Sequence, residues 1–274
     1  MVTGLRVTVL MTNSLEENNS KKLSIQVRLD GLSFFTQDLA SETIISYENY
    51  PFKNKVDALG LTQELERVYH NNALLRQSYK KVTVVYVNTL FTFIPKAVFN
   101  EDFLADYLKF NTKILATDYI AYDILEKQDM VCVYVPYTNC NNLFFDYYGS
   151  FDYHHSMSLL VKDTLDSLSK REETTRLLVN VHNSSFELLA YQDKTVLLAN
   201  CFDFTTKEDF IYYLLFIMEQ LSLDPETTEV DLVGNISKES PLYTIAYTYI
   251  RHLSIKNKSL PQLAETDYTA TTLL

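Results

Sequence analysis

Two short polar stretches in this chain of 274 residues have the composition of tight turns that can approach a phosphate group. They are Asp30-Gly31-Leu32-Ser33 and His182-Asn183-Ser184-Ser185. Backbone N–H groups of a tight turn can cradle phosphate oxygens, and a carboxylate such as that of Asp30 can hold Mg²⁺. Asp-Gly is also what an ordinary two-residue hairpin prefers, since that turn needs positive φ. Both interpretations of the first stretch stay open on the residues alone.

The second stretch keeps a turn-forming residue but contains no acid and no glycine. Asn183 tolerates positive φ, so we expect the turn to persist, whereas Mg²⁺ prefers oxygen ligands that a histidine does not supply. A third candidate turn follows a strand-like run at Gly234, which either approaches an adenosine or only ends the strand. No catalytic residue and no metal ligand is predicted. The residues expected to contact a nucleotide, if one binds, are Asp30, Gly31, Ser33, Asn183, Ser184, Gly234 and Asn235.

Other enzyme classes find little support in the sequence. It contains no Walker A, GxGxxG or HExxH motif. The adjacent pair His154-His155 is the most metal-like feature, but neighbours on a strand point to opposite faces, so we interpret the pair as structural. Cys132, Cys140 and Cys201 show no CxxC spacing. They predict neither a zinc site nor a disulfide framework, and they fit a reducing cytoplasm.

Composition narrows the classes of partner. A net charge of −11 and few clustered basic residues argue against binding to nucleic acid. The longest apolar run, residues 210–218, is far shorter than the roughly 20 residues of a membrane span, so we interpret it as a buried helix. Twenty tyrosines and 16 phenylalanines indicate aromatic core packing or an interaction surface, and the run at 144–155 is the place to look for such a surface.

The elements that must position the turns follow the same order in both halves of the chain. Alternating or β-branched runs predict strands, and spacing at 3.6 residues predicts helices. In the first half we expect strands at 23–29, 32–37, 43–50 and 82–87, with helices at 56–69 and, opened by Pro95, at 96–109. In the second half we expect strands at 177–181, 185–191, 195–202 and 229–233, with helices from Thr205 or Thr206 to about 221 and from Pro241 to about 252.

This repeated order indicates an internal duplication. An offset of 152 residues pairs Asp30 with His182, and an offset of 146 pairs Pro95 with Pro241. Between the halves we expect strands at 119–125 and 130–136 and a helix at about 156–169. The tail, residues 253–274, shows little periodicity and is expected to be irregular or frayed. The predicted division is a first lobe at 1–170, with inserted elements, and a second lobe at 171–274.

A meander of three strands followed by helix, strand and helix, present twice, resembles the tandem ribonuclease-H-like layout of the actin-like ATPases. The resemblance spans about 20–255 and includes a bacterial domain-of-unknown-function family of that fold. The segments that carry it are LSIQVRLDGLSF, FIPKAVF, LLVNVHNSSFELLAY and VDLVGNISKESPLYTIAYTYIRH. It implies an α/β fold of two lobes, each a mixed β-sheet flanked by helices.

In active members of that superfamily each hairpin carries an Asp-x-Gly-type turn for phosphate and Mg²⁺, and a late glycine-rich turn takes the adenosine. Here the second hairpin lacks the acid and the third turn keeps one glycine. We therefore expect a degenerate, non-catalytic cytoplasmic protein without a cofactor, which binds a protein partner as a scaffold or assembly factor. The alternative is an ATP-binding protein, with Mg²⁺ and with weak or absent ATPase activity, whose site is the cleft between the lobes.

Overall fold

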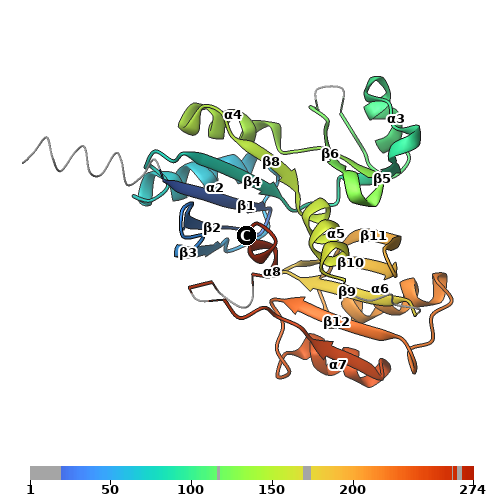
Figure 1. Cartoon of the computed structure of the whole chain (residues 1–274). Helices are drawn as coiled ribbons and strands as arrows, with labels where there is room; N and C mark the ends of the chain where they lie inside the picture. The colour runs from blue at the N-terminus through green and yellow to red at the C-terminus, as the bar shows by residue number, and fades with distance from the viewer. Residues whose placement is uncertain (1–19, 116–117, 169–173, 261, 264–266) are drawn as a thin grey trace, which may run out of the picture.

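The computed structural model describes residues 20–115, 118–168, 174–260, 262–263 and 267–274, and it contains three β-sheets (Figure 1). Two of the sheets have five strands each, in the orders β3-β2-β1-β4-β8 and β11-β10-β9-β12-β13. In both, an antiparallel meander of three strands continues into two parallel strands. The third sheet, in the order β5-β7-β6, is antiparallel throughout. The actin-like two-lobed α/β architecture expected from the sequence is therefore present.

The predicted strands and helices of the two large sheets lie close to the observed ones, whereas α4, β8 and β13 were not predicted. The first lobe contains β1 (Lys21–Arg28), β2 (Gly31–Asp38), β3 (Ile44–Pro51), α2 (Ala58–Asn71), β4 (Lys81–Tyr86), α4 (Thr138–Tyr148) and β8 (Asp152–His155). The second contains β9 (Arg176–Val181), β10 (Ser185–Gln192), β11 (Thr195–Asp203), α6 (Lys207–Gln220), β12 (Glu229–Gly234), α7 (Pro241–Tyr249) and β13 (His252–Ile255). The predicted boundary at residue 170 lies within 169–173, outside the described residues.

The two lobes repeat each other in detail, but the first hairpin does so in a register different from the predicted one. Each lobe has a β-bulge between its second and third strands, where the third strand carries one extra residue, Ile45 in β3 and Leu197 in β11. The hairpin loops Leu29-Asp30 and Asn183-Ser184 also correspond, and Asp30 and Ser184 are 154 residues apart. The predicted offset of 152 was therefore wrong by two residues for the first hairpin. It was correct for the third strand, where Ile45 corresponds to Leu197 and Phe52 to Phe204. A slip of two keeps every side chain on its own face of the strand, so the hydrophobic pattern does not reveal it.

The third sheet is an insertion between β4 and α4, and here one prediction was wrong. Pro95 ends strand β5 (Phe91–Pro95) instead of opening a helix, because Pro95 is paired with Met130 in the β5–β7 ladder. The predicted helix at 96–109 is divided into η1 (Lys96–Val98), η2 (Glu101–Phe103) and α3 (Leu104–Leu108). The counterpart of α7 is α4, which follows the insertion, so the offset of 146 paired unlike positions. The other inserted elements are β6 (Ala121–Leu125), η3 (Glu126–Gln128) and β7 (Met130–Tyr134).

Helices cover the outer faces of both large sheets. Helix α2 buries Leu61, Leu65 and Val68 in the core of the first lobe. Helix α6 contains the long apolar run and buries Phe210 and Leu214 in the core of the second lobe, as predicted. Amphipathic burial of this kind fixes each helix on its sheet.

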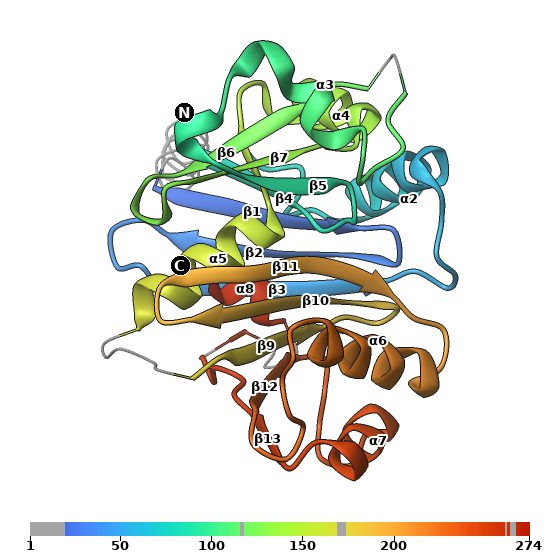
Figure 2. The same cartoon turned by 90° about the vertical axis from the view of Figure 1, so that its right-hand side faces the viewer.

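Two further helices lie between the large sheets (Figures 1 and 2). These are α5 (Ser156–Ser167), which joins the lobes, and α8 (Tyr268–Thr271). The expectation of an irregular or frayed tail was wrong for β13 and for 267–274. All four residues of α8 are buried, because Ala270 and Leu273 pack against Phe35 and Val85 of the first sheet. Residues 261 and 264–266 of the predicted tail lie outside the described residues.

Candidate functional site between the lobes

The two predicted turns meet directly. The carboxylate of Asp30 accepts hydrogen bonds from the backbone N–H of Ser184 (3.1 Å) and from its hydroxyl (2.7 Å). The other carboxylate oxygen of Asp30 lies 3.3 Å from Nε of Arg28, and both of these residues are only 8% exposed. Asp30, which only one of the two open interpretations placed at Mg²⁺, is thus engaged by both lobes at once.

Neither turn has the backbone conformation expected from its sequence. Asp30, Gly31 and Asn183 all lack positive φ, and the first turn is centred on Leu29 and Asp30, with Gly31 already paired in β2. The interpretation of Asp30-Gly31 as a type I′ turn was therefore wrong. Glycine at 31 relieves a close approach instead: a Cβ there would lie 3.0 Å from the carbonyl oxygen of Tyr50 in β3.

The third turn is bonded to the second. Gly234 has φ +86°, and a Cβ on it would lie 2.6 Å from Oδ1 of Asn180 and 3.0 Å from the backbone nitrogen of Val181. The backbone N–H of Asn235 donates to the carbonyl of Val181 (2.7 Å), and its side-chain amide donates to Oδ1 of Asn183 (2.8 Å). Gly234 therefore ends β12 against the neighbouring strand, and Asn235 joins two turns of the same lobe.

The open space around these turns is small. A cavity of about 130 Å³ is lined by residues that include Asp30, Lys55, Ser184 and Asp203. A second one of about 80 Å³ lies beside Arg28 and is lined also by Tyr47, Asn49, His182, Asn183, Asn235 and Asp267. Small-molecule sites typically have about 300–1,000 Å³. Neither cavity has the volume of a nucleotide site with the lobes in this arrangement.

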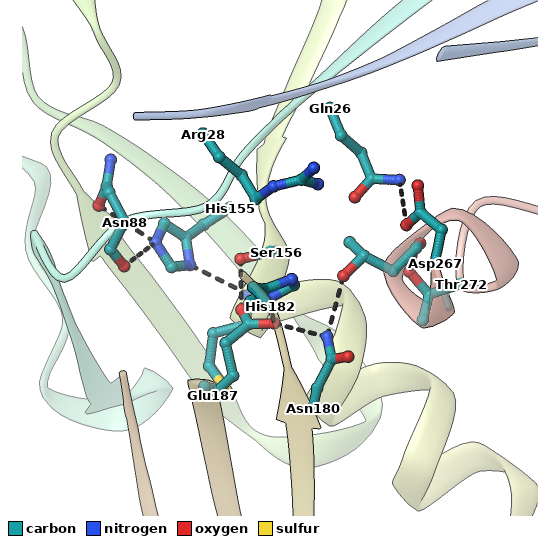
Figure 3. Close-up of polar contacts among 12 residues, drawn as sticks. Gln26, Arg28, Asn88, His155, Ser156, Asn180, His182, Glu187, Asp267 and Thr272 are labelled. Atoms are coloured by element: carbon teal, nitrogen blue, oxygen red, sulfur yellow. Dashed lines mark hydrogen bonds and ion pairs between the residues drawn. The ribbon is translucent and has the colours of Figure 1, made fainter. Parts of the chain in front are cut away.

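A buried acid that sequence reasoning missed organises the second lobe's inner face. Glu187 of β10 accepts hydrogen bonds from Ser156, from Asn180 (2.8 Å) and from His182 (3.1 Å) (Figure 3). Burial acts to raise the pKa of Glu187, but the bonds from His182 and Ser156 outweigh it and leave the pKa below its ordinary value. An acid between Phe186 and Leu188 in a strand with a buried face was the signal that could have found it.

His155 is buried beside this network. Its Nε2 faces the carbonyl oxygen of Asn88 (3.2 Å), and its Nδ1 accepts from the N–H of Met157 (3.1 Å). The ring is therefore neutral with its proton on Nε2, and burial lowers its pKa to about 4. His154 points away and lies 2.9 Å from Asp123, as strand alternation predicts. Within the described ranges no group of three or more His, Cys, Asp or Glu could hold a metal ion.

Ser33 does not face the turn to which the sequence assigned it. Its hydroxyl donates to Asp267 (2.7 Å), a residue of the segment that carries α8. Gln26 donates to the same carboxylate (2.8 Å), and so does the hydroxyl of Tyr47 (2.9 Å). Of the seven predicted site residues, Asp30, Asn183, Ser184 and Asn235 meet at the turns, whereas Gly31, Ser33 and Gly234 each contact other parts of the fold.

Two duplicated lobes with meander, helix, strand, helix and strand, whose first hairpins face each other, define the actin-like ATPase fold. The chain belongs to the family described as "Protein of unknown function (DUF3822)", whose model matches residues 11–253. A comparison with curated proteins found no match.

Two solved structures agree with this fold, and a third is a weaker match. A protein of actin-like ATPase fold and unknown function from Bacteroides thetaiotaomicron is similar at 23% identity and TM-score 0.82, over 94% of this chain and 96% of that one. A PilM–PilN type IV pilus biogenesis complex matches at 12% identity and TM-score 0.55, over 86% and 88%. The cytoplasmic domain of EpsL from the type II secretion system of Vibrio cholerae matches at 12% identity and TM-score 0.46, over 92% and 95%.

Proposed function

We propose that this protein is a non-catalytic member of the actin-like fold that acts as a protein-binding scaffold or assembly factor. The observation that carries the proposal is the direct bond between Asp30 and Ser184. A phosphate-binding arrangement needs space between the facing turns, and here the acid of one turn is bonded to the other. No step of nucleotide hydrolysis is available to an Asp30 that is engaged in this way.

The shared fold with PilM supports a protein partner, since that protein was solved in a complex with PilN. This support is an analogy between folds, and the partner itself must be argued from the surface of this chain. None of the helices described here is long and apolar enough to cross a bilayer. The cysteines are free and buried, which supports the cytoplasm, a reducing compartment, as the place of action.

The surface that fits a partner is an aromatic groove along α4 and β8. It has a volume of about 420 Å³. Phe145 and Tyr119, on its rim, are 64% and 52% exposed, and Phe144 of the same aromatic run is buried instead. The lining contains no charged side chain, which favours an uncharged apolar segment of the partner. The lining residues are Tyr119, Thr138, Asn141, Asn142, Phe145, Gly149, Ser150, Phe151 and Tyr153.

Photo-crosslinking in cells tests this proposal. A crosslinker placed at Thr138, on the groove, should capture one reproducible protein, and Phe145→Ser should abolish the capture. Phe110→Ser is the matched control, because Phe110 is 85% exposed and does not line the groove. Capture that survives Phe145→Ser, or that Phe110→Ser removes equally, would contradict the proposed surface.

A second candidate function is ATP binding between the lobes, which the fold itself favours. It requires Asp30 to release Ser184 and the lobes to separate. Thermal unfolding with millimolar Mg-ATP distinguishes the two candidates, since a ligand at 100 times its Kd stabilises the folded state by about 2.7 kcal/mol. We expect an unchanged Tm, and a clear rise would replace the scaffold proposal with this one.

A further inference from the structure

The inner face of the first sheet carries a group of hydrogen-bond donors aimed at one point. Gln26 and Ser33 are cross-strand neighbours on β1 and β2, and Tyr47 comes from β3. All three donate to the carboxylate of Asp267, at 2.8, 2.7 and 2.9 Å. Burial and the nearby Asp267 raise the pKa of Tyr47, so its phenol keeps the proton that it donates. Together they form a site of three neutral donors for the carboxylate, and Arg28 lines the same small cavity as Tyr47 and Asp267.

The segment that supplies the carboxylate is held at several other points. Asp267 caps α8 by accepting from the N–H of Ala270 (3.2 Å). Asn180 of the second lobe donates to the hydroxyl of Thr269 (2.9 Å), and Lys22 of the first donates to the carbonyl of Leu273 (2.7 Å). Residues 267–274 therefore contact both lobes through specific polar bonds as well as through their apolar side chains.

The arrangement is reciprocal between the two lobes. Ser33 pairs with Gln26 across β1 and β2, and Glu187 pairs with Asn180 across β9 and β10, in corresponding registers. In the second lobe the acid lies on the sheet and the hydroxyl, that of Ser156, opens helix α5. In the first lobe the hydroxyl lies on the sheet, and the acid, Asp267, caps α8. The inner face of each sheet thus binds the N-terminus of one helix through a hydrogen bond between a hydroxyl and a carboxylate. The carboxylate belongs to the sheet in the second lobe and to the helix start in the first.

We propose that the inner face of the first sheet is a peptide-binding site for a short helical segment capped by a carboxylate, and that residues 267–274 occupy it as an intramolecular ligand. The partners of Asp267 on the sheet are 241, 234 and 220 residues distant in sequence. The segment forms no strand of either sheet. This site is separate from the aromatic groove and does not depend on the scaffold proposal.

A complementation experiment tests the site. The chain is ended after Thr266, and a fluorescein-labelled peptide of residues 267–274, DYTATTLL, is titrated with it by fluorescence anisotropy. We expect saturable binding to the shortened chain, and binding at least tenfold weaker to the full chain, whose own segment competes. The peptide with Asp267→Asn should bind about tenfold more weakly or worse, because bonds to a charged acceptor are lost. Leu274→Ser is the control peptide, since Leu274 is 50% exposed.

A folded shortened chain that does not bind the peptide, or that binds the Asp267→Asn peptide equally well, would overturn the proposal. A second measurement covers the case in which the shortened chain fails to fold. The full chain with Asp267→Asn keeps Gln26, Ser33 and Tyr47 and should bind the labelled parent peptide at least tenfold more tightly than the unchanged full chain does. The full chain with Leu274→Ser should show no such gain. Equal affinity for both variants would refute the site.

Discussion

Two glycines of this protein share left-handed φ but differ in their surroundings. Gly234 has φ +86° and is closed in by Asn180 and Val181, whereas Gly149 has φ +71° and open space where a Cβ would point. The two positions therefore illustrate two different reasons for glycine. One is a backbone conformation that other residues rarely adopt, and the other is the close approach of neighbouring atoms.

Substitution of each by alanine measures the two effects. We expect Gly149→Ala to lower the free energy of unfolding by about 1–3 kcal/mol, through backbone strain alone. Gly234→Ala should lower it by about 2 kcal/mol more, since the new methyl group meets the neighbouring strand. Urea unfolding of both variants checks this prediction, and equal losses would show that Val181 and Asn180 yield without cost.

His155 makes stability depend on pH. Its pKa is about 4 in the folded protein, because burial disfavours the charged ring although Glu187 and Asp123 favour it, and an unfolded histidine titrates near 6.5. Between these values the unfolded chain binds more protons, so the folded state loses stability as pH falls from about 6.5 to 4. The contribution is about 3 kcal/mol.

His155→Gln should flatten the dependence of the unfolding free energy on pH over that range. His154→Gln, in which the adjacent and more exposed ring is replaced, is the matched control and should keep most of the slope. An unchanged slope in His155→Gln would mean that other groups carry the acid sensitivity.

At the scale of elements, helix α6 shows where local sequence suffices. The hydroxyl of Thr206 caps the helix by accepting from the N–H of Asp209 (3.1 Å). The carboxylate of Asp209 in turn accepts from the N–H of Thr206 (2.8 Å). The two partners are only three residues apart in sequence. The prediction that the helix begins at Thr205 or Thr206 is therefore correct. Thr206→Ala should cost about 1 kcal/mol in urea unfolding. Thr205→Ala should cost less than about 0.5 kcal/mol, and similar losses would locate the cap one residue earlier.

Pro95 shows where local sequence misleads. Proline suits both the first turn of a helix and the end of a strand, and the choice is made by Met130, which pairs with it from a later strand. The interpretation of Asp30-Gly31 as a type I′ turn was wrong for a related reason. Gly31 is favoured by the close approach of Tyr50 in the neighbouring strand and not by positive φ. The first four strands of each large sheet, with helices α2, α6 and α7, were thus predictable. Helix α4 and the edge strands β8 and β13 were missed, and the turns and the insertion depend on contacts from outside their own segments.

At the scale of the whole molecule, Asp30 and Ser184 join the two lobes. A double-mutant cycle with Asp30→Ala and Ser184→Ala should give a coupling energy of about 1.5–3 kcal/mol, because the bond has a charged acceptor. The same cycle with Ser185→Ala should give less than about 0.5 kcal/mol. Coupling near zero for Ser184 would show that its hydroxyl contributes nothing to the bond with Asp30.

The meeting of the lobes was the least predictable part of the site. The sequence suggests two facing turns, and the structure brings them together. It does not suggest that Ser33 would contact Asp267, 234 residues further along, or that Glu187 would collect bonds from three elements. Contacts between residues so far apart in sequence leave no periodic signal. Each partner lies in a segment whose hydrophobic pattern is explained by its own strand or helix.

The three-stranded insertion has one more implication. Its entry and exit are adjacent, since the N–H of Val135 donates to the carbonyl of Leu90 (2.9 Å), and Ile94, Leu108, Val131 and Val133 form a cluster within it. A stretch of DNA acquired at a single point of an already duplicated gene would add such a unit without changing the order of any older strand. Relatives that diverged before that event would then carry a short connection between the counterparts of β4 and α4.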